Sequence, residues 1–333
     1  MPLARLSRLL WLCAALWMLG AAVWGWTHGQ PVFALGLALL PLAAHALALG
    51  LEMALARRAA QGLARSPAAG VPPAVLPPLR HWVRAWAGEW VAALRVFGWQ
   101  QPWRHRAEPD VLPDVLPEVF PEGAWGRRGV VLVHGFVCNR GFWNRWLRRL
   151  RREGVPVVAV DLGPVFAPIE ALVPALEQAV SRIEACTGRA PVVVAHSMGG
   201  LVLRCWWATH GDVRRVHRAL TLGTPHHGTL LARRAFSPNT RQMRPHSAWL
   251  QRLDAAESPA CRTRITCFQA ACDNVVFPLP LARLDGADNR VLAGLAHVDM
   301  VDSPAVWRAL QDALGADDPA TPRPYGAASK SAG

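Results

Sequence analysis

A serine stands near the middle of the chain between small residues, in the stretch Ala-His-Ser-Met-Gly-Gly at 195–200. The stretch follows a β-branched run and precedes a helical pattern, which is the setting of the nucleophile elbow G-x-S-x-G, here with Ala in the first position. Small neighbours are needed because the elbow holds its serine at strained φ and ψ angles, where larger side chains would collide with the adjacent strand and helix. The pattern predicts that Ser197 is a nucleophile.

Such a serine needs an acid and a base, which follow it along the chain in the order Ser, Asp or Glu, His. Asp273 comes shortly after the β-branched run at 265–270, and His297 follows the last such run. We therefore predict that His297 takes the proton of Ser197 and that Asp273 holds the imidazole in the required tautomer. Other residues in comparable places compete for these roles: Asp161, Asp285, Asp288, His226 and His227.

The oxyanion formed when a serine attacks a carbonyl needs backbone N–H donors. The N–H of Met198, directly after the nucleophile, is predicted to be one of them. The second is predicted to be the N–H of Phe136, because His-Gly-Phe at 134–136 ends the first β-branched run of this region. We expect His134 to bond its own loop and His196 to point away from the nucleophile.

Short β-branched runs alternate with helical patterns from Gly129 onward. The residues from Ile169 to Ile183 have the i, i+3, i+4, i+7 spacing of a helix with one buried face. This alternation predicts a mostly parallel sheet with helices on both faces, in which reactive groups collect beyond the carboxyl ends of the strands. The predicted strands are 130–133, 155–160, 192–195, 219–222, 265–270 and 291–295.

Two uncharged apolar runs, Leu9 to Trp26 and Val32 to Leu51, lie near the beginning of the chain. Each has about the length of a helix that crosses the roughly 30 Å hydrocarbon core of a bilayer. Arginines flank the pair on both outer sides and are absent from the turn at 27–31, which predicts a transmembrane hairpin with both ends in the cytoplasm. A signal peptide or single anchor and a buried helical pair in a soluble protein are the alternatives.

These patterns divide the chain into four parts. We expect a membrane hairpin at 1–56, a connector rich in Pro and Trp at 57–128, a catalytic domain at 129–315 and a disordered tail at 316–333. The connector contains one predicted helix, Leu79 to Phe97, which would lie either in the membrane interface or against the catalytic domain. No chemistry is assigned to this helix.

Composition argues against several classes of function. The formal net charge is +13, but the arginines are not interleaved with RNA-binding aromatics, so nucleic-acid binding is not predicted. The seven cysteines have no regular spacing and predict no disulfide framework. His226 and His227 are adjacent without further ligands at a suitable spacing, so neither a metal nor a cofactor is predicted. The two apolar runs contain no charge pathway or repeat of the kind found in transporters.

The motifs together resemble those of bacterial triacylglycerol lipases and esterases in the α/β-hydrolase superfamily, over about residues 125–315. The resemblance rests on five blocks: 134–136, 195–200, 221–229, 273–278 and His297. It implies an α/β-hydrolase fold with a short cap at 230–262 over the active site. It also implies an acyl pocket with these lining residues: Met243, Trp249, Leu250 and Leu253.

The resemblance implies hydrolysis of a carboxylic ester through an acyl-enzyme at Ser197. The predicted hairpin distinguishes this chain from secreted lipases, so we expect lipid or lipophilic esters as substrates and the bacterial inner (cytoplasmic) membrane as location, with the catalytic domain on the cytoplasmic side. An acyltransferase with the same triad and a catalytically silent, membrane-anchored interaction protein are the alternatives. The oligomeric state is not predicted.

Overall fold

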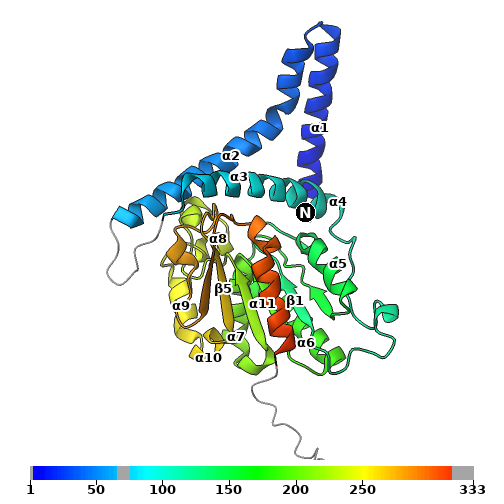
Figure 1. Ribbon diagram of the computed structural model, residues 1–333, viewed down its shortest axis with the longest axis vertical. Coiled ribbons are helices and arrows are strands. Elements are labelled where there is room, and N and C mark those ends of the chain that lie inside the picture. Colours follow the sequence, from blue (N-terminus) through cyan, green and yellow to red (C-terminus); the bar gives the residue numbers. More distant parts are fainter. Residues whose placement is uncertain (1–2, 66–75, 317–333) are drawn as a thin grey trace, which may run out of the picture.

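The computed structural model describes residues 3–65 and 76–316. Figure 1 shows a helical hairpin that stands on a layered body of strands and helices, with one long helix lying between the two. The predicted tail falls outside the described residues except for Ala316, and part of the proline-rich connector also lies outside them.

The body is built on a six-stranded parallel sheet with the strand order β2-β1-β3-β4-β5-β6. Its strands are β1 Val130–Val133, β2 Val157–Ala159, β3 Val192–His196, β4 Arg218–Leu222, β5 Ile265–Ala270 and β6 Asp288–Leu292. Five of the six agree closely with the predicted ranges. The edge strand β6 begins and ends three residues earlier than the predicted strand 291–295, because its polar first residues face solvent and Gly294, at φ 66°, follows its end.

Successive strand residues point to opposite faces of the sheet, and helices cover both faces. On one face Val131 and Val133 pack in a core with α6 (Val173–Thr187) and α7 (Met198–His210). On the other face Val130 and Leu132 pack with α5 (Asn144–Arg152) and α11 (Pro304–Gly315). The predicted α/β architecture with helices on both sides is confirmed. Short 3-10 helices connect these elements: Pro117–Val119, Arg140–Trp143, Ile169–Leu172, Val213–Arg215, Leu279–Ala282 and Asp299–Asp302.

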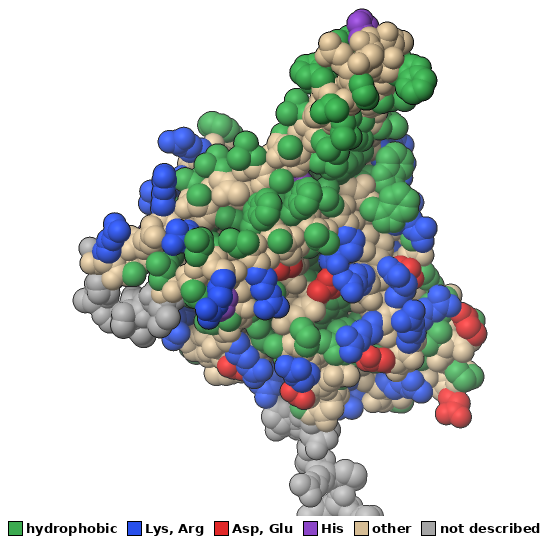
Figure 2. All heavy atoms as spheres, turned by 45° about the horizontal axis from the view of Figure 1, so that its top comes forward, with side chains coloured by type: hydrophobic (Ala, Val, Ile, Leu, Met, Phe, Trp, Pro, Cys, Tyr) green, Lys and Arg blue, Asp and Glu red, His purple; other side chains and the backbone are tan. Residues whose placement is uncertain are grey.

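The hairpin consists of α1 (Leu3–Thr27) and α2 (Pro31–Arg65), both long and apolar enough to cross a membrane. Their large apolar side chains face outward, including Leu16 at 67% exposed and Leu47 at 74% exposed. Figure 2 shows hydrophobic side chains covering the hairpin, whereas Lys and Arg side chains gather around its foot and on the body. Because both helices are almost wholly unburied, the structure does not show a buried helical pair.

The helix α3 (Leu79–Ala93) continues as a π-helix (Leu94–Gln100) and the short α4 (Gln101–Trp103), and crosses the foot of the hairpin (Figure 1). On one side the indole N–H of Trp86 donates to the carbonyl oxygen of Ala46 in α2 at 2.9 Å. On the other side Ala92 and Val96 belong to the core of the body. Of the two predicted placements for this helix, the structure therefore shows packing against the catalytic domain. The four-part division of the chain stays a prediction, although α2 extends beyond residue 56 to Arg65.

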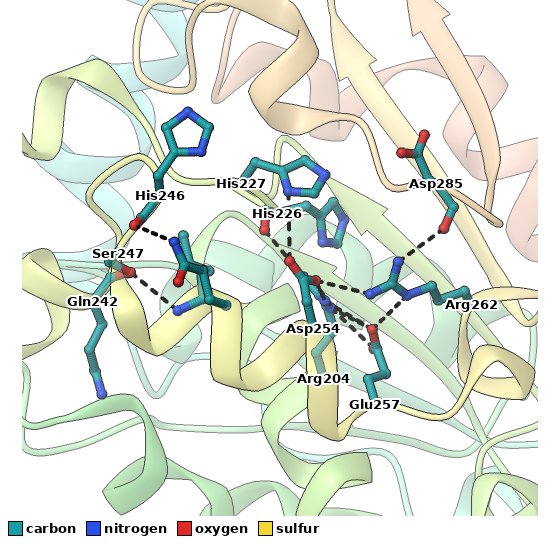
Figure 3. Close-up of polar contacts among 12 residues, drawn as sticks. Arg204, His226, His227, Gln242, His246, Ser247, Asp254, Glu257, Arg262 and Asp285 are labelled. Atoms are coloured by element: carbon teal, nitrogen blue, oxygen red, sulfur yellow. Dashed lines mark hydrogen bonds and ion pairs between the residues drawn. The ribbon is translucent and has the colours of Figure 1, made fainter.

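The cap predicted at 230–262 is a set of short helices: η6 Leu230–Arg234, α8 Pro238–Gln242, α9 Ala248–Ala256 and α10 Pro259–Arg262. Its anchor is Arg204 of α7, whose guanidinium is fully buried and donates to Asp254 at 2.6 Å and to Glu257 at 2.9 Å. Arg262 donates to the same two carboxylates, each at 2.9 Å (Figure 3). This buried ion network fixes the cap to the helix that begins directly after Ser197.

Candidate active site

Ser197 occupies the sharp turn between β3 and α7, with φ 54° and ψ −127°. A residue other than glycine at such angles stores about 1–3 kcal/mol of strain and persists only where its surroundings hold it. The N–H of Ser197 donates to the carbonyl oxygen of Leu222 at 2.8 Å, and its carbonyl oxygen accepts from Gly200 at 3.0 Å. The backbone is therefore fixed on both sides of the serine.

The small residues of the elbow are explained by close backbone approach. A Cβ atom on Gly199 would lie 2.7 Å from the carbonyl oxygen of His134 and 2.8 Å from that of Val133. Ala195 is fully buried in β3 between β1 and β4, where its single methyl group fits. The first turn of α7 can therefore pass directly over the end of β1.

His297 and Asp273 form a buried pair in the loops that follow β6 and β5. The Nδ1 atom of His297 lies 3.0 Å from Oδ2 of Asp273, and the other carboxylate oxygen accepts from the N–H groups of Val275 at 2.8 Å and Val276 at 2.7 Å. Burial disfavours the imidazolium form, but nearby acidic side chains, with Asp273 the largest contributor, outweigh it and raise the pKa of His297 above its ordinary value. Asp273 is thus oriented by its own turn toward the imidazole.

Gly223, the residue after β4, brings this pair beside the serine. Its φ angle is +57°, and a Cβ atom there would lie 3.0 Å from Nδ1 of His297 and 3.2 Å from Oδ2 of Asp273. Leu222, which accepts the hydrogen bond from Ser197, immediately precedes this glycine. Nε2 of His196 also lies 3.0 Å from the carbonyl oxygen of His297. The three residues predicted to form a triad therefore follow the carboxyl ends of β3, β5 and β6, and the pair lies beside Gly223 at the end of the intervening strand β4.

The two predicted oxyanion donors also lie at this place. Met198 is the first residue of α7, and the N–H groups of a first helical turn have no acceptor within their own helix. The loop of Phe136 touches Ser197, because a Cβ atom on Gly135 would lie 2.8 Å from Cβ of Ser197. Phe136 and Ser197 line one cavity.

The two histidines next to the site make structural contacts. Nε2 of His134 accepts from the N–H of Leu162 at 2.9 Å, so its Nδ1 carries the proton and donates to the carbonyl oxygen of Gly135 at 2.9 Å. The ring of His196 stacks on Phe142 with 4.6 Å between centroids, and burial lowers the pKa of this histidine well below its ordinary value. Neither arrangement suits a proton acceptor for Ser197.

The competing residues bond other groups in the described chain, and none has a hydrogen bond to Ser197 or His297 there. They are placed as follows: Asp161 beside His134, Asp285 with Arg283, Asp288 with Arg290, His226 with Thr221 and His227 beside Asp254. Within the same residues, no group of three or more His, Cys, Asp and Glu side chains is arranged to hold a metal ion.

A small apolar cavity of about 120 Å³ opens beside Ser197. Its walls include Leu231, Ala232 and Met243 from the cap, and Val275 and Val276 from the turn that follows Asp273. Of the four residues expected to line an acyl pocket, only Met243 does so in the described chain. Trp249, Leu250 and Leu253 instead face the core, because the apolar face of α9 packs on α7.

Sequence reasoning missed two carboxylates that reach this site from the N-terminal helices. Glu89 of α3 is 2% exposed and accepts from the N–H groups of Val298 at 2.7 Å and Asp299 at 3.0 Å, just after His297. Burial raises the pKa of Glu89 to about 8. Glu52 of α2 accepts from the side-chain amide of Asn274 at 2.8 Å. The sequence did contain a signal for these two residues, because Glu52 and Glu89 are the only acidic residues among the first 107.

A parallel sheet with a strained serine after one strand and a paired Asp and His after later strands defines the class of α/β hydrolases. Residues 130–332 match the model of the alpha/beta hydrolase family, and the chain belongs to that family.

Similar solved structures support the fold. The mature lipase BlEst2 of Bacillus licheniformis has a TM-score of 0.50 and 18% identity over 57% of this chain and 92% of that chain. Lipase B of Aspergillus fumigatus has a TM-score of 0.50 and 18% identity over 58% of this chain and 54% of that chain. At these identities the likeness shows the fold alone. No curated protein sequence matches the chain.

Proposed function

We propose that this protein is a membrane-anchored serine hydrolase of carboxylic esters. The observation that carries the proposal is the strained Ser197 beside the buried pair of Asp273 and His297. Nε2 of His297 takes the proton as Oγ of Ser197 attacks the ester carbonyl, and returns it to the departing alcohol as the acyl-enzyme forms. His297 then takes a proton from water as the water attacks the acyl-enzyme, and gives this proton to Oγ of Ser197 as the C–O bond breaks and the carboxylic acid leaves.

The oxyanion of each tetrahedral intermediate is stabilised by the N–H groups of Met198 and Phe136. Donors that are fixed before the reaction are the most effective, and both belong to backbone that is held in place, by α7 and by the loop after β1. Asp273 keeps the proton of His297 on Nδ1 and stabilises the imidazolium as it forms.

Lipid or lipophilic esters are the proposed substrates. The cavity beside Ser197 is lined mainly by apolar side chains, which suits an acyl chain. The loops of Asp273 and His297 also pack against the foot of the hairpin, through Cys272, Phe277 and Ala296, so the site lies near the membrane surface. Ester substrates dissolved in a bilayer would then be close to the nucleophile.

The bacterial inner membrane is the proposed location, with the catalytic domain on the cytoplasmic side. The outward-facing apolar side chains of α1 and α2 support a transmembrane hairpin. Arg57 and Arg58 at the foot of α2 and Arg5 and Arg8 at the start of α1 support the orientation, because positive charge is enriched on the cytoplasmic side.

Product analysis separates hydrolysis from acyl transfer. The purified full chain is incubated with a series of p-nitrophenyl esters in two mixtures. One contains the ester alone, and the other also contains a short alcohol and a glyceride. Free carboxylic acid is the expected product in both mixtures. If the acyl group passes mainly to the added alcohol, the protein is an acyltransferase that uses the same triad.

Cell fractionation tests the proposed location in the membrane, and recovery of the protein in the soluble fraction would contradict it.

A further inference from the structure

The charge distribution of the N-terminal region is unusual, because its first 107 residues contain many arginines but only two acidic residues, Glu52 and Glu89. Glu52 lies on the hairpin helix α2 and Glu89 on α3. Both side chains bond residues of the catalytic body that adjoin the predicted triad, across sequence separations of 222 and 209 residues. Their positions therefore need an explanation beyond the general burial of a helix face.

Glu52 connects the hairpin to the loop of Asp273. Oε2 of Glu52 accepts from Nδ2 of Asn274, the residue after Asp273, at 2.8 Å. The side-chain oxygen of Asn274 lies 3.4 Å from the backbone nitrogen of His297 and accepts its N–H. The hydrogen-bonded chain runs from the membrane helix through Asn274 to the backbone of the proposed base.

Apolar packing holds the foot of α2 at the same place. Met53 and Ala56 of α2 are buried in one cluster with Cys272 and Phe277 on the Asp273 loop. Ala296, which directly precedes His297, belongs to this cluster. Residues of both predicted triad loops therefore share one buried cluster with the part of α2 that follows Glu52.

Glu89 holds the other side of the His297 loop. Its two carboxylate oxygens accept from the N–H of Val298, at 3.0 and 2.7 Å, and one also accepts from Asp299 at 3.0 Å. Buried N–H groups without an acceptor are costly, so the loop depends on the Glu89 carboxyl group for its conformation. With Asn274 on one side and Glu89 on the other, three consecutive N–H groups starting at His297 are bonded by these two groups.

We propose that Glu52 and Glu89 are positioning residues for the triad, so that the membrane hairpin and α3 complete the active site. This inference rests on the proposed function of Ser197, Asp273 and His297. Neither carboxylate is among the residues lining the cavity beside Ser197 in the described chain. Loss of either should therefore lower kcat by displacing the imidazole and leave KM nearly unchanged.

The test measures kcat and KM of the full chain in detergent with the soluble ester p-nitrophenyl butyrate, for Glu52→Leu, Glu52→Gln and Glu89→Leu. A displacement of about 1 Å costs on the order of a hundredfold in rate, so we expect kcat to fall about tenfold to a hundredfold in Glu52→Leu and Glu89→Leu. Glu52→Gln should recover most of the activity, because its amide oxygen still accepts from Asn274. The matched control is Glu118→Leu, since Glu118 is 59% exposed and pairs with Arg151 on the surface.

Asn274→Ala breaks the same connection from the catalytic side and gives a second route if Glu52→Leu does not accumulate in the membrane. It should show the same loss of kcat, and the double variant with Glu52→Leu should lose little more, because both changes remove one link. Wild-type kcat in Glu89→Leu, and in either Glu52→Leu or Asn274→Ala, overturns the positioning proposal. These outcomes test the positioning proposal only if the wild type is active. A folded wild type that hydrolyses no ester and does not react with an alkyl fluorophosphonate would instead refute the proposed function.

Discussion

Replacing Arg204 by Met would leave the carboxylate of Glu257 buried without its main counter-charge. Both side chains are fully buried, and the guanidinium of Arg204 makes hydrogen bonds to Glu257, Asp254 and a backbone carbonyl. Removing one partner of a buried ion pair costs about 3–5 kcal/mol. We expect about 3 kcal/mol, at the lower end, because Arg262 still lies 2.9 Å from Glu257. For a domain of this size each 1 kcal/mol lowers the melting temperature by about 2–4 °C, so the expected fall is about 6–12 °C.

Thermal unfolding of the full chain in detergent, followed by tryptophan fluorescence, measures this change. The control is Arg214→Met, because Arg214 pairs with Asp212 at the surface and should change the melting temperature little. KM for a long-chain ester should also rise in Arg204→Met, since the cap supplies Met243 to the cavity. A melting temperature within about 2 °C of wild type would refute the reasoning, because the buried network would then contribute no net stability.

Three further predictions concern the site itself. Asp273→Asn should lower kcat by about 10³–10⁴ in steady-state assays, because the wrong tautomer of His297 is favoured, and a loss below tenfold would contradict this role. The pKa of His297 is raised and the base must be neutral, so kcat/KM should fall as the pH drops through a midpoint above about 6.5, whereas a flat profile from pH 6 to 8 would contradict it. Gly223→Ala should lower kcat at least about tenfold by displacing His297, whereas Gly286→Ala, also at positive φ but with its nearest atom 3.5 Å away, should not.

The elbow and the sheet could be predicted from sequence because their signals are local. Ser197 is recognisable from its small neighbours, and five of the strands from short runs of mainly apolar residues, as expected for buried parallel strands. The range predicted for the edge strand β6 lay too far along the chain. One face of this strand is solvated and its first residues are polar, so it lacks the apolar pattern of the other strands. The pattern of α9 indicated an apolar face but not whether the face met the cavity or α7.

The contacts of Glu52 and Glu89 could not be predicted from local patterns. Each acts across more than 200 residues, and the packing of α2 and α3 against the triad loops arises only when the sheet has formed. The helix that carries Glu89 was assigned no chemistry, because its tryptophans dominate its pattern. The scarcity of acidic residues in this region was the single signal that pointed to them.

Covalent labelling of Ser197 tests the central claim most directly. Folded full-length protein and the Ser197→Ala variant are treated with an alkyl fluorophosphonate, and the modified peptide is identified by mass spectrometry. The account predicts labelling of wild type on Ser197, loss of labelling and ester turnover in Ser197→Ala, and unchanged melting temperature. Labelling that persists in the variant, or a folded wild type that neither reacts nor hydrolyses any ester in the series, would contradict it.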